Sequence, residues 1–398
     1  MITLHQDADM AAQLQRTLIG AYDGAADLGE AMATAERVAP GDYGHWHAAW
    51  AHTAAVAEAA GDDAAAHGHG TFAARGYLRA AEYWRQAYFF LRHNLADERV
   101  VTGYERQRAA FRKAAPYLPC QVDELAIPFG PAPLPGYLFR PLPDGQQRPT
   151  VLFTGGFDNT AEELWKYGAA TAVGLGWNAL RWDGPGQGGM LVEQHVPMRP
   201  DFEAVLTPVV DWLLEQPFAD PRRVLLVGRS LGGYLAPRGA SGEPRISAMV
   251  ADPGQYDFTS RFAASFGAGE WQKVLRADPD MDARLEKFLA TPRDREYYGA
   301  RMAAMGAAGF GEWLRILTGY TLAGRAEAIT CPTLITEGEG DFASQSATLF
   351  DALTCEKQYR EFPQSAGAGG HCEGMGQTLW QHAAYSWLAD VMARSPRP

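Results

Sequence analysis

A short apolar run leads directly into a serine flanked by glycines. Residues 224–233 read Val-Leu-Leu-Val-Gly-Arg-Ser-Leu-Gly-Gly, and the residues that follow favour a helix. A serine at such a strand-to-helix turn has a strained backbone, and the glycines leave space for neighbouring backbone. The turn also presents the hydroxyl at a helix N-terminus, which stabilises negative charge. We therefore predict that Ser230 is a nucleophile; the alternative is a glycine-rich turn with a capping serine.

The sequence after Cys120 alternates short apolar runs with helical segments, which is typical of a mostly parallel sheet with crossover helices. A helix is expected over 201–215, with Asp201 as its N-cap. Between residues 256 and 325 the strand rhythm stops and the sequence becomes helical, which indicates a helical cap insertion. The predicted strands are 150–154, 177–182, 223–227, 247–251, 333–336 and 358–362.

The first part of the chain predicts helices instead. Apolar residues recur every three or four positions up to about residue 118, and residues 71–93 place Tyr77, Ala81, Trp84, Tyr88 and Leu91 on one face. Such a face must be buried against another element. We predict an α/β-hydrolase fold with two parts: an N-terminal helical lid domain over 1–118 and a catalytic domain over 119–398, which includes the cap insertion at 256–325.

A serine hydroxyl needs a base oriented by an acid, and in this fold the chain order is serine, acid, histidine. Asp341 follows the strand predicted at 333–336, and Glu337 and Glu339 are competing acids. His371 lies in a glycine-rich loop after the last predicted strand. The histidines His195 and His382 fit the required order less well.

The oxyanion of the intermediate needs two N–H donors. Leu231 supplies one, and we predict Phe157 in the turn Gly155–Asp158 as the other. Asp158 has two interpretations, because Thr160 and Glu163 have capping-box spacing: it belongs to a helix start, or it contacts the substrate. We expect Asp158, Gly156 and Arg229 to contact the substrate.

Composition limits the partners. The net charge is −12 and no basic run occurs, which argues against nucleic acid and favours a small-molecule substrate. No segment approaches the roughly 20 apolar residues that span a bilayer, and the start does not look like a signal peptide, so we expect no membrane association and a cytoplasmic location. The helical region offers a surface for a homodimer.

Cysteine and histidine spacing predicts neither disulfides nor a metal site. The four cysteines show no C-x-x-C spacing, so we expect free thiols. The loop Arg181–Gly189 matches neither a P-loop nor a dinucleotide fingerprint, and we predict no metal and no other cofactor. The histidines clustered near the N-terminus, which lack acidic company, are His45, His47, His52, His67 and His69.

The motifs together resemble the α/β-hydrolase family that includes 2,6-dihydroxypseudooxynicotine hydrolase, fungal pigment polyketide-shortening hydrolases and FrsA-like proteins. The resemblance rests on GGFDNTAEE at 155–163, DGPGQG at 183–188, GRSLGGYLAPR at 228–238, the Cys331-Pro-Thr-Leu strand leading to Asp341, GGHCEG at 369–374 and the N-terminal YLRAAEYWRQAYFF.

The resemblance implies a hydrolase that cleaves a carbon–carbon bond beside a ketone, an ester or a thioester. In the nicotine-degrading member, an acidic residue at the position of Asp158 assists catalysis, and here that residue is one methylene shorter than glutamate. The leading hypothesis is therefore a serine hydrolase acting through an acyl-enzyme on a small aromatic or polyketide-like substrate. Acyl transfer or cyclisation with the same triad is the alternative, and a non-catalytic binding protein is a third hypothesis, which retention of Ser230, Asp341 and His371 argues against.

Overall fold

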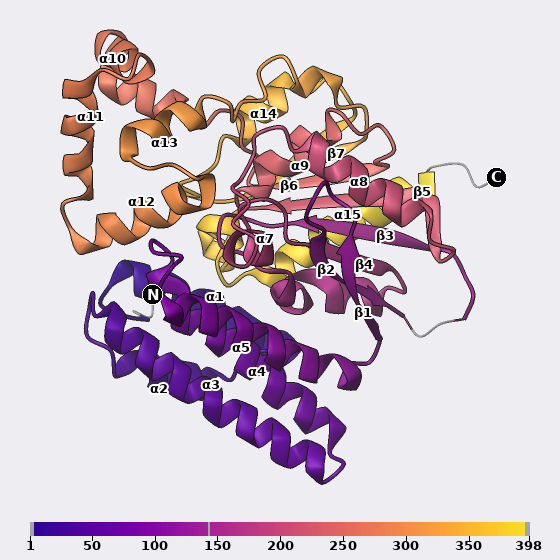
Figure 1. The fold of residues 1–398 in the computed structure, drawn as a ribbon. Coiled ribbons are helices and arrows are strands. Elements are labelled where there is room, and N and C mark those ends of the chain that lie inside the picture. The colour runs from indigo at the N-terminus through magenta and orange to yellow at the C-terminus, as the bar shows by residue number, and fades with distance from the viewer. Residues whose placement is uncertain (1–3, 142–143, 395–398) are drawn as a thin grey trace.

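The computed structural model describes residues 4–141 and 144–394, and these form one eight-stranded sheet flanked by helices (Figure 1). The strand order is β1-β2-β4-β3-β5-β6-β7-β8. The pairs β1–β2 and β2–β4 are antiparallel and all others are parallel, as predicted for a mostly parallel sheet. The strands are β1 Gln121–Ile127, β2 Leu134–Arg140, β3 Arg148–Thr154, β4 Asn178–Trp182, β5 Ala219–Arg229, β6 Ala248–Asp252, β7 Thr333–Gly338 and β8 Lys357–Phe362.

Both faces of the central strands are buried because helices cover both. Successive side chains of a strand point to opposite faces, so β3 sends Val151 to one core and Leu152 to the other, and β5 does the same with Leu225 and Leu226. The crossover and C-terminal helices are α6 Ala170–Gly174, α7 Gly188–Val192, α8 Glu203–Leu214, α9 Gly232–Ala240, α14 Ser346–Ala352 and α15 Gln377–Arg394.

The N-terminal helices form a bundle whose core is continuous with that of one sheet face. Aspartates begin four of these helices, since the side chains of Asp7, Asp27, Asp42 and Asp97 accept hydrogen bonds from first-turn N–H groups. The tightest contact joins α3 and α4 at Gly76, where an added Cβ would lie 2.6 Å from the Cα of the facing glycine. The bundle helices are α1 Ala8–Leu18, α2 Leu28–Glu36, α3 Tyr43–Ala66, α4 Gly70–Tyr88 and α5 Glu98–Ala114.

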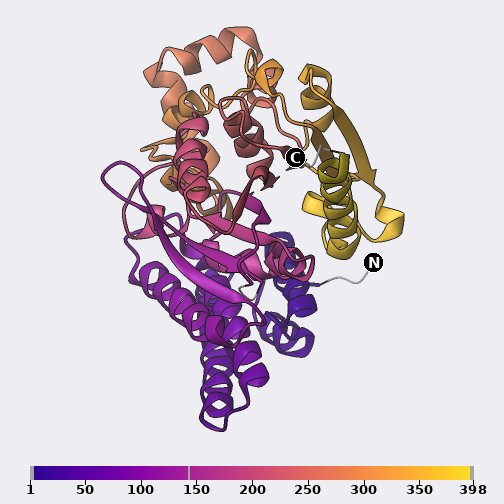
Figure 2. The same ribbon diagram turned by 90° about the vertical axis from the view of Figure 1, so that its right-hand side faces the viewer.

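The segment between β6 and β7 is helical, as the loss of strand rhythm predicts. Its apolar residues, including Trp313 and Leu317, join the core on the sheet face opposite the bundle. Figure 2 shows the salmon part of this segment at the top of the molecule and the purple helices of the bundle at the bottom, and Arg293 of α12 pairs with Asp9 of the bundle. The cap helices are α10 Ser260–Leu275, α11 Pro279–Leu285, α12 Pro292–Met305 and α13 Phe310–Leu317.

Two features differ from the sequence-based prediction. Strands β1 and β2 were not expected, because β1 is an edge strand whose residues are mostly not fully buried, which leaves no continuous apolar run. Asp201 is not the N-cap of α8: the cap position is Phe202, and the Asp201 carboxylate instead pairs with Arg199 at 2.6 Å. All six predicted strands are present.

The helices of the described residues include none whose length and apolar character would allow it to span a membrane.

Candidate active site

Ser230 lies in the turn between β5 and α9 with the strained backbone that the motif predicts. Its φ is +57°, in the left-handed region. The motif glycines are required by close backbone approach, because a Cβ on Gly228 would lie 2.0 Å from the Gly232 carbonyl oxygen, and one on Gly232 would lie 2.3 Å from that of Thr154. The Ser230 N–H donates to the Asp252 carbonyl at 2.7 Å, which fixes the turn against β6.

The structure brings Ser230, His371 and Asp341 together. His371 Nε2 lies 2.9 Å from Ser230 Oγ, and His371 Nδ1 lies 2.9 and 3.0 Å from the two carboxylate oxygens of Asp341. The carboxylate is fully buried and also accepts the backbone N–H groups of Ala343 and Cys372. This fixed carboxylate orients the imidazole toward the serine.

The surroundings of His371 favour its charged form. Burial acts to lower the pKa of the imidazole, but Cys372 and the Asp341 carboxylate more than offset that effect and raise the pKa well above its usual range. The exposed ring of Phe342 lies 4.9 Å from the imidazole and covers it. Because its pKa is raised, the His371 imidazole would retain a proton that it takes from Ser230.

Replacing Asp341 with asparagine is expected to shift the pH profile of kcat/KM to lower pH. The base must be neutral to accept a proton, so a raised pKa places the rise of activity above pH 6.5; removing the carboxylate lowers that pKa, and the midpoint moves down. The maximal rate should also fall, by roughly 10⁴-fold, because the imidazolium loses its partner. A pH series of ester hydrolysis measures both effects.

The matched control is Glu339→Gln, which removes an acid of the same loop that binds the N–H of Gln364 instead of His371. This variant should keep the wild-type midpoint. An unchanged midpoint in Asp341→Asn would contradict the proposed partnership between Asp341 and His371.

The competing residues named from the sequence have other surroundings. Glu337 accepts hydrogen bonds from Ser344 and Tyr359. His195 and His382 do not line the cavity that contains Ser230. The histidine in contact with Ser230, and the acid in contact with that histidine, are thus the residues that the chain order predicts.

The turn after β3 lies directly beside the serine. A Cβ on Gly156 would be 2.9 Å from Ser230 Oγ, and the Gly156 N–H donates to Asn159 Oδ1 at 2.8 Å. The N–H groups of Phe157 and Leu231 have no hydrogen-bond acceptor in the described chain. Both amides are therefore available to a substrate oxygen, as the oxyanion-hole prediction requires.

Gln187 holds this turn in place, and sequence reasoning missed it. Its side-chain Nε2 donates to the carbonyl oxygens of Gly155 and Gly156 at 3.0 and 2.8 Å. The DGPGQG motif contributes to the family resemblance, but its sequence alone does not indicate that Gln187 supports the turn after β3. Gly156 itself packs behind Ser230 and is not among the residues that line the cavity, which argues against the substrate contact expected for it.

Arg229 lines the cavity, where its contact with substrate stays a prediction, and its guanidinium also binds groups of the protein. Its Nε donates to Asp252 at 2.7 Å, its Nη1 to Gln377 at 2.5 Å, and its Nη2 to Glu373 at 3.0 Å and to the Cys372 carbonyl. Asp252 and Glu373 are fully buried. Because Arg229 precedes Ser230 and Glu373 follows His371 by two residues, this network ties the nucleophile turn to the histidine loop.

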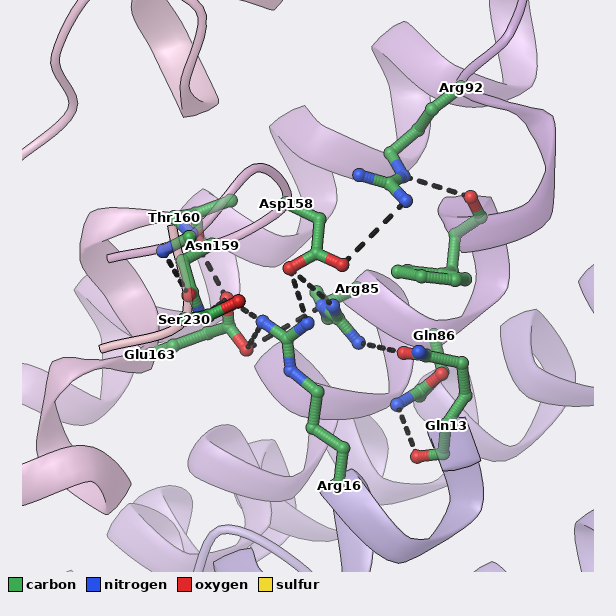
Figure 3. Close-up of polar contacts among 12 residues, drawn as sticks. Gln13, Arg16, Arg85, Gln86, Arg92, Asp158, Asn159, Thr160, Glu163 and Ser230 are labelled. Atoms are coloured by element: carbon green, nitrogen blue, oxygen red, sulfur yellow. Dashed lines mark hydrogen bonds and ion pairs between the residues drawn. The ribbon is translucent and has the colours of Figure 1, made fainter. Parts of the chain in front are cut away.

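Asp158 lies within a cluster of arginines from the N-terminal bundle (Figure 3). Its carboxylate is 2.6 Å from Arg16, 3.8 Å from Arg85 and 3.9 Å from Arg92. Burial acts to raise the pKa of Asp158, but these three cations hold it well below its usual range. Asp158 is therefore an anion that links the β3 turn to the bundle, and its contact with substrate stays a prediction.

The capping box beside Asp158 is present as its spacing predicts. Thr160 caps the short helix Ala161–Glu163, and the Glu163 carboxylate accepts the Thr160 N–H at 3.0 Å. Arg16 also binds Glu163, at 2.9 Å. Asp158 precedes the cap by two residues and is not part of the box.

A cavity of about 1020 Å³ opens above Ser230. Residues of the bundle, the sheet and the cap all line it, among them Phe89, Phe157 and Tyr298. Its size, and a wall that combines aromatic with charged side chains, suit a small organic molecule.

All four cysteines are free, as predicted from their spacing. Among the described residues, one group, Asp341, His371 and Cys372, brings three atoms that could ligate a metal within 4.8 Å of one another. Asp341 and Ser230 already occupy the two ring nitrogens of His371. We therefore interpret this group as part of the serine site.

A mostly parallel sheet with a strained serine between strand and helix, facing a histidine and an acid, defines an α/β-hydrolase. Sequence comparison identifies the family of the chain within this class. The chain belongs to the FrsA-like esterase family, which it matches over residues 36–255.

Named relatives are hydrolases. The chain is 33% identical to "Hydrolase LUC6" of a Fusarium species over 92% of both chains, and 32% identical to "20-hydroxy-prefusarin hydrolase FUS2" of Gibberella moniliformis over 92% of this chain and 93% of that one. The solved structure of 2,6-dihydroxy-pseudo-oxynicotine hydrolase shares the fold, with a TM-score of 0.73 at 23% identity over 94% of this chain and 95% of that one. This protein is accordingly an enzyme of the α/β-hydrolase class.

Proposed function

We propose that this enzyme is a serine hydrolase that acts through an acyl-enzyme on a ketone carbon–carbon bond, an ester or a thioester. The observation that carries the proposal is the 2.9 Å contact between Ser230 Oγ and His371 Nε2, with Asp341 on the other ring nitrogen. This arrangement has the geometry of a nucleophile, a base and an orienting acid.

The reaction begins when Ser230 Oγ attacks the substrate carbonyl carbon and its proton passes to His371 Nε2. The carbonyl oxygen becomes an oxyanion that accepts the N–H groups of Phe157 and Leu231. The tetrahedral intermediate collapses, the bond to the leaving group breaks, and His371 returns the proton to that group. Water, deprotonated by His371, then attacks the acyl carbon and releases Ser230.

The nature of the leaving group decides which further stabilisation is needed. An alkoxide or thiolate accepts the proton from His371 directly. In carbon–carbon cleavage the leaving carbanion requires a neighbouring carbonyl or aromatic ring to delocalise its electron pair. The aromatic lining of the cavity is compatible with such conjugated substrates.

We propose a small aromatic or polyketide-like substrate. The relative FUS2 is named for hydrolysis of 20-hydroxy-prefusarin, and it aligns over nearly the whole of this chain. We further propose that residues 1–118 act as a lid domain and residues 256–325 as a cap, since both contribute side chains to the cavity wall. The bundle and the cap would then set which substrates fit.

A fluorophosphonate probe is expected to label Ser230, and mass spectrometry of the digested protein locates the adduct. His371→Ala should label far more slowly, because the hydroxyl loses its base. His382→Ala changes a histidine outside the cavity and should label like wild type. Absence of labelling in folded wild-type protein would overturn the proposal.

Product analysis then identifies the reaction. A panel of β-diketones, aryl ketones, esters and thioesters is incubated with the enzyme, and the products are identified by mass spectrometry. Free acids indicate hydrolysis, whereas a cyclic or transferred product would contradict it. Asp158→Asn on the same panel shows whether that carboxylate takes part in the reaction.

A further inference from the structure

The cavity has a polar end away from the serine. Arg92, which follows α4, contributes to it from the bundle, and Glu296 and Arg301 of α12 contribute from the cap. In Figure 3, Ser230 and Arg92 lie on opposite sides of Asp158. A substrate whose carbonyl lies at Ser230 can therefore extend toward this end, which we call the distal subsite: Arg92, Glu296 and Arg301.

The Glu296 carboxyl has no hydrogen-bond or ion-pair partner among the residues that the structure describes. The residue is 6% exposed, lines the cavity, and its Oε1 has no hydrogen bond. Burial raises its pKa to about 7, although Arg92 and Arg301 act to lower it. The other oxygen, Oε2, also has no hydrogen bond within the described chain but is not shut off from solvent, and since leaving a buried carboxyl unsatisfied is costly, we expect a ligand in the cavity to bond to Oε2.

The two arginines of the distal subsite have spare capacity. Arg301 donates to the Tyr297 carbonyl at 2.7 Å and stacks 3.6 Å from that ring, and it forms no ion pair in the described chain. Arg92 donates to the Phe89 carbonyl at 2.9 Å and reaches Asp158 only at 3.9 Å. Neither guanidinium forms an ion pair with Glu296 within the described chain, although all three side chains line the same cavity.

From this arrangement we propose that the distal subsite binds an anionic oxygen group of the substrate, a carboxylate or an enolate, remote from the carbonyl attacked by Ser230. The guanidinium groups of Arg92 and Arg301 donate charge-assisted hydrogen bonds to the anion, and the Glu296 carboxyl donates a further one. Aromatic side chains such as Phe157 and Tyr298 contact the apolar part of the molecule between the two ends. This inference rests on the proposed function and specifies its substrate class.

The test compares neutral esters with anionic counterparts on the unreactive Ser230→Ala protein. One pair is p-nitrophenyl octanoate and mono-p-nitrophenyl octanedioate, with the carboxylate on the acyl side. The other pair is phenyl octanoate and 4-octanoyloxybenzoate, with the carboxylate on the leaving-group side. Calorimetry should show that the anionic member of at least one pair binds about tenfold or more tightly, as expected for hydrogen bonds to a charged group.

Variants in the Ser230→Ala background assign the preference to the subsite. Arg301→Gln should reduce it to about threefold or less while neutral esters bind as before. Glu296→Gln, which keeps a donor, should retain more of the preference than Glu296→Ala. Arg276→Gln removes the same charge from an exposed cap position outside the cavity and should change nothing.

Equal affinity within both pairs, or a preference that persists in Arg301→Gln, would overturn the inference. Hydrolysis of the neutral esters by wild-type enzyme is measured separately. Loss of that activity contradicts the proposed function and leaves the binding result intact, so the two failures are distinguishable.

Discussion

Ser230→Ala should lower kcat for an activated ester by roughly 10⁴- to 10⁶-fold, because without the hydroxyl no acyl-enzyme forms and only the oxyanion donors and substrate binding remain. The substitution removes one oxygen from a site that is already shaped by backbone, so the fold should persist. Steady-state kinetics on a p-nitrophenyl ester, with thermal unfolding as a check of the fold, measures the effect.

The matched control is Ser247→Ala. That hydroxyl donates to the Arg222 carbonyl on the protein surface and makes no contact with His371. It should retain wild-type kinetics. If Ser230→Ala kept more than a small fraction of wild-type activity while correctly folded, the proposed nucleophile would be wrong.

Arg229→Met should lower the free energy of unfolding by about 3–5 kcal/mol. The substitution leaves the buried carboxyl groups of Asp252 and Glu373 without the cation that both contact, and their remaining oxygens already lack partners. The pKa of Glu373 is raised well above its usual range, chiefly by burial and by Asp252, so the loss of Arg229 would favour its neutral form further. Chemical denaturation measures the change.

Two further variants separate charge loss from simple truncation. Arg222→Met removes an exposed arginine near the start of the same strand and should change stability by less than about 0.5 kcal/mol. Adding Glu373→Gln to Arg229→Met should recover part of the lost stability, because the folded protein no longer has to bury a titratable carboxyl group without its cationic partner. A change in Arg229→Met no larger than that in Arg222→Met would refute the proposed network.

The same network explains how the catalytic elements are held. Arg229 connects the serine turn with the histidine loop, and from the other side Arg261 of the cap donates to the carbonyls of Phe342 and Ser344 beside the acid. The loop that carries Asp341 is therefore attached to the cap. We expect cap substitutions near Arg261 to alter kcat as well as substrate affinity.

Local sequence patterns were sufficient to predict the strained turn at Ser230 and most of the sheet. The strand-turn-helix around Ser230 depends on apolar residues and glycines within ten positions, and the chain order then pointed to Asp341 and His371. The hairpin of β1 and β2 was missed because its edge strand carries no buried apolar run, and Asp201 was assigned as a cap although Arg199 engages it.

By itself, therefore, the sequence determined the fold class and the six strands β3 to β8, and it predicted Ser230, Asp341 and His371 as one site, since backbone conformation and periodic burial are local properties. Only the tertiary structure decided the partners of Arg229 and Asp158, and it left the Glu296 carboxyl without a hydrogen-bond partner among the described residues. Arg229 and Glu373 are 144 positions apart, and Arg16 and Asp158 are 142 apart. Pairing of charges over such separations depends on how the bundle, the sheet and the cap meet, and one sequence carries no local pattern for that.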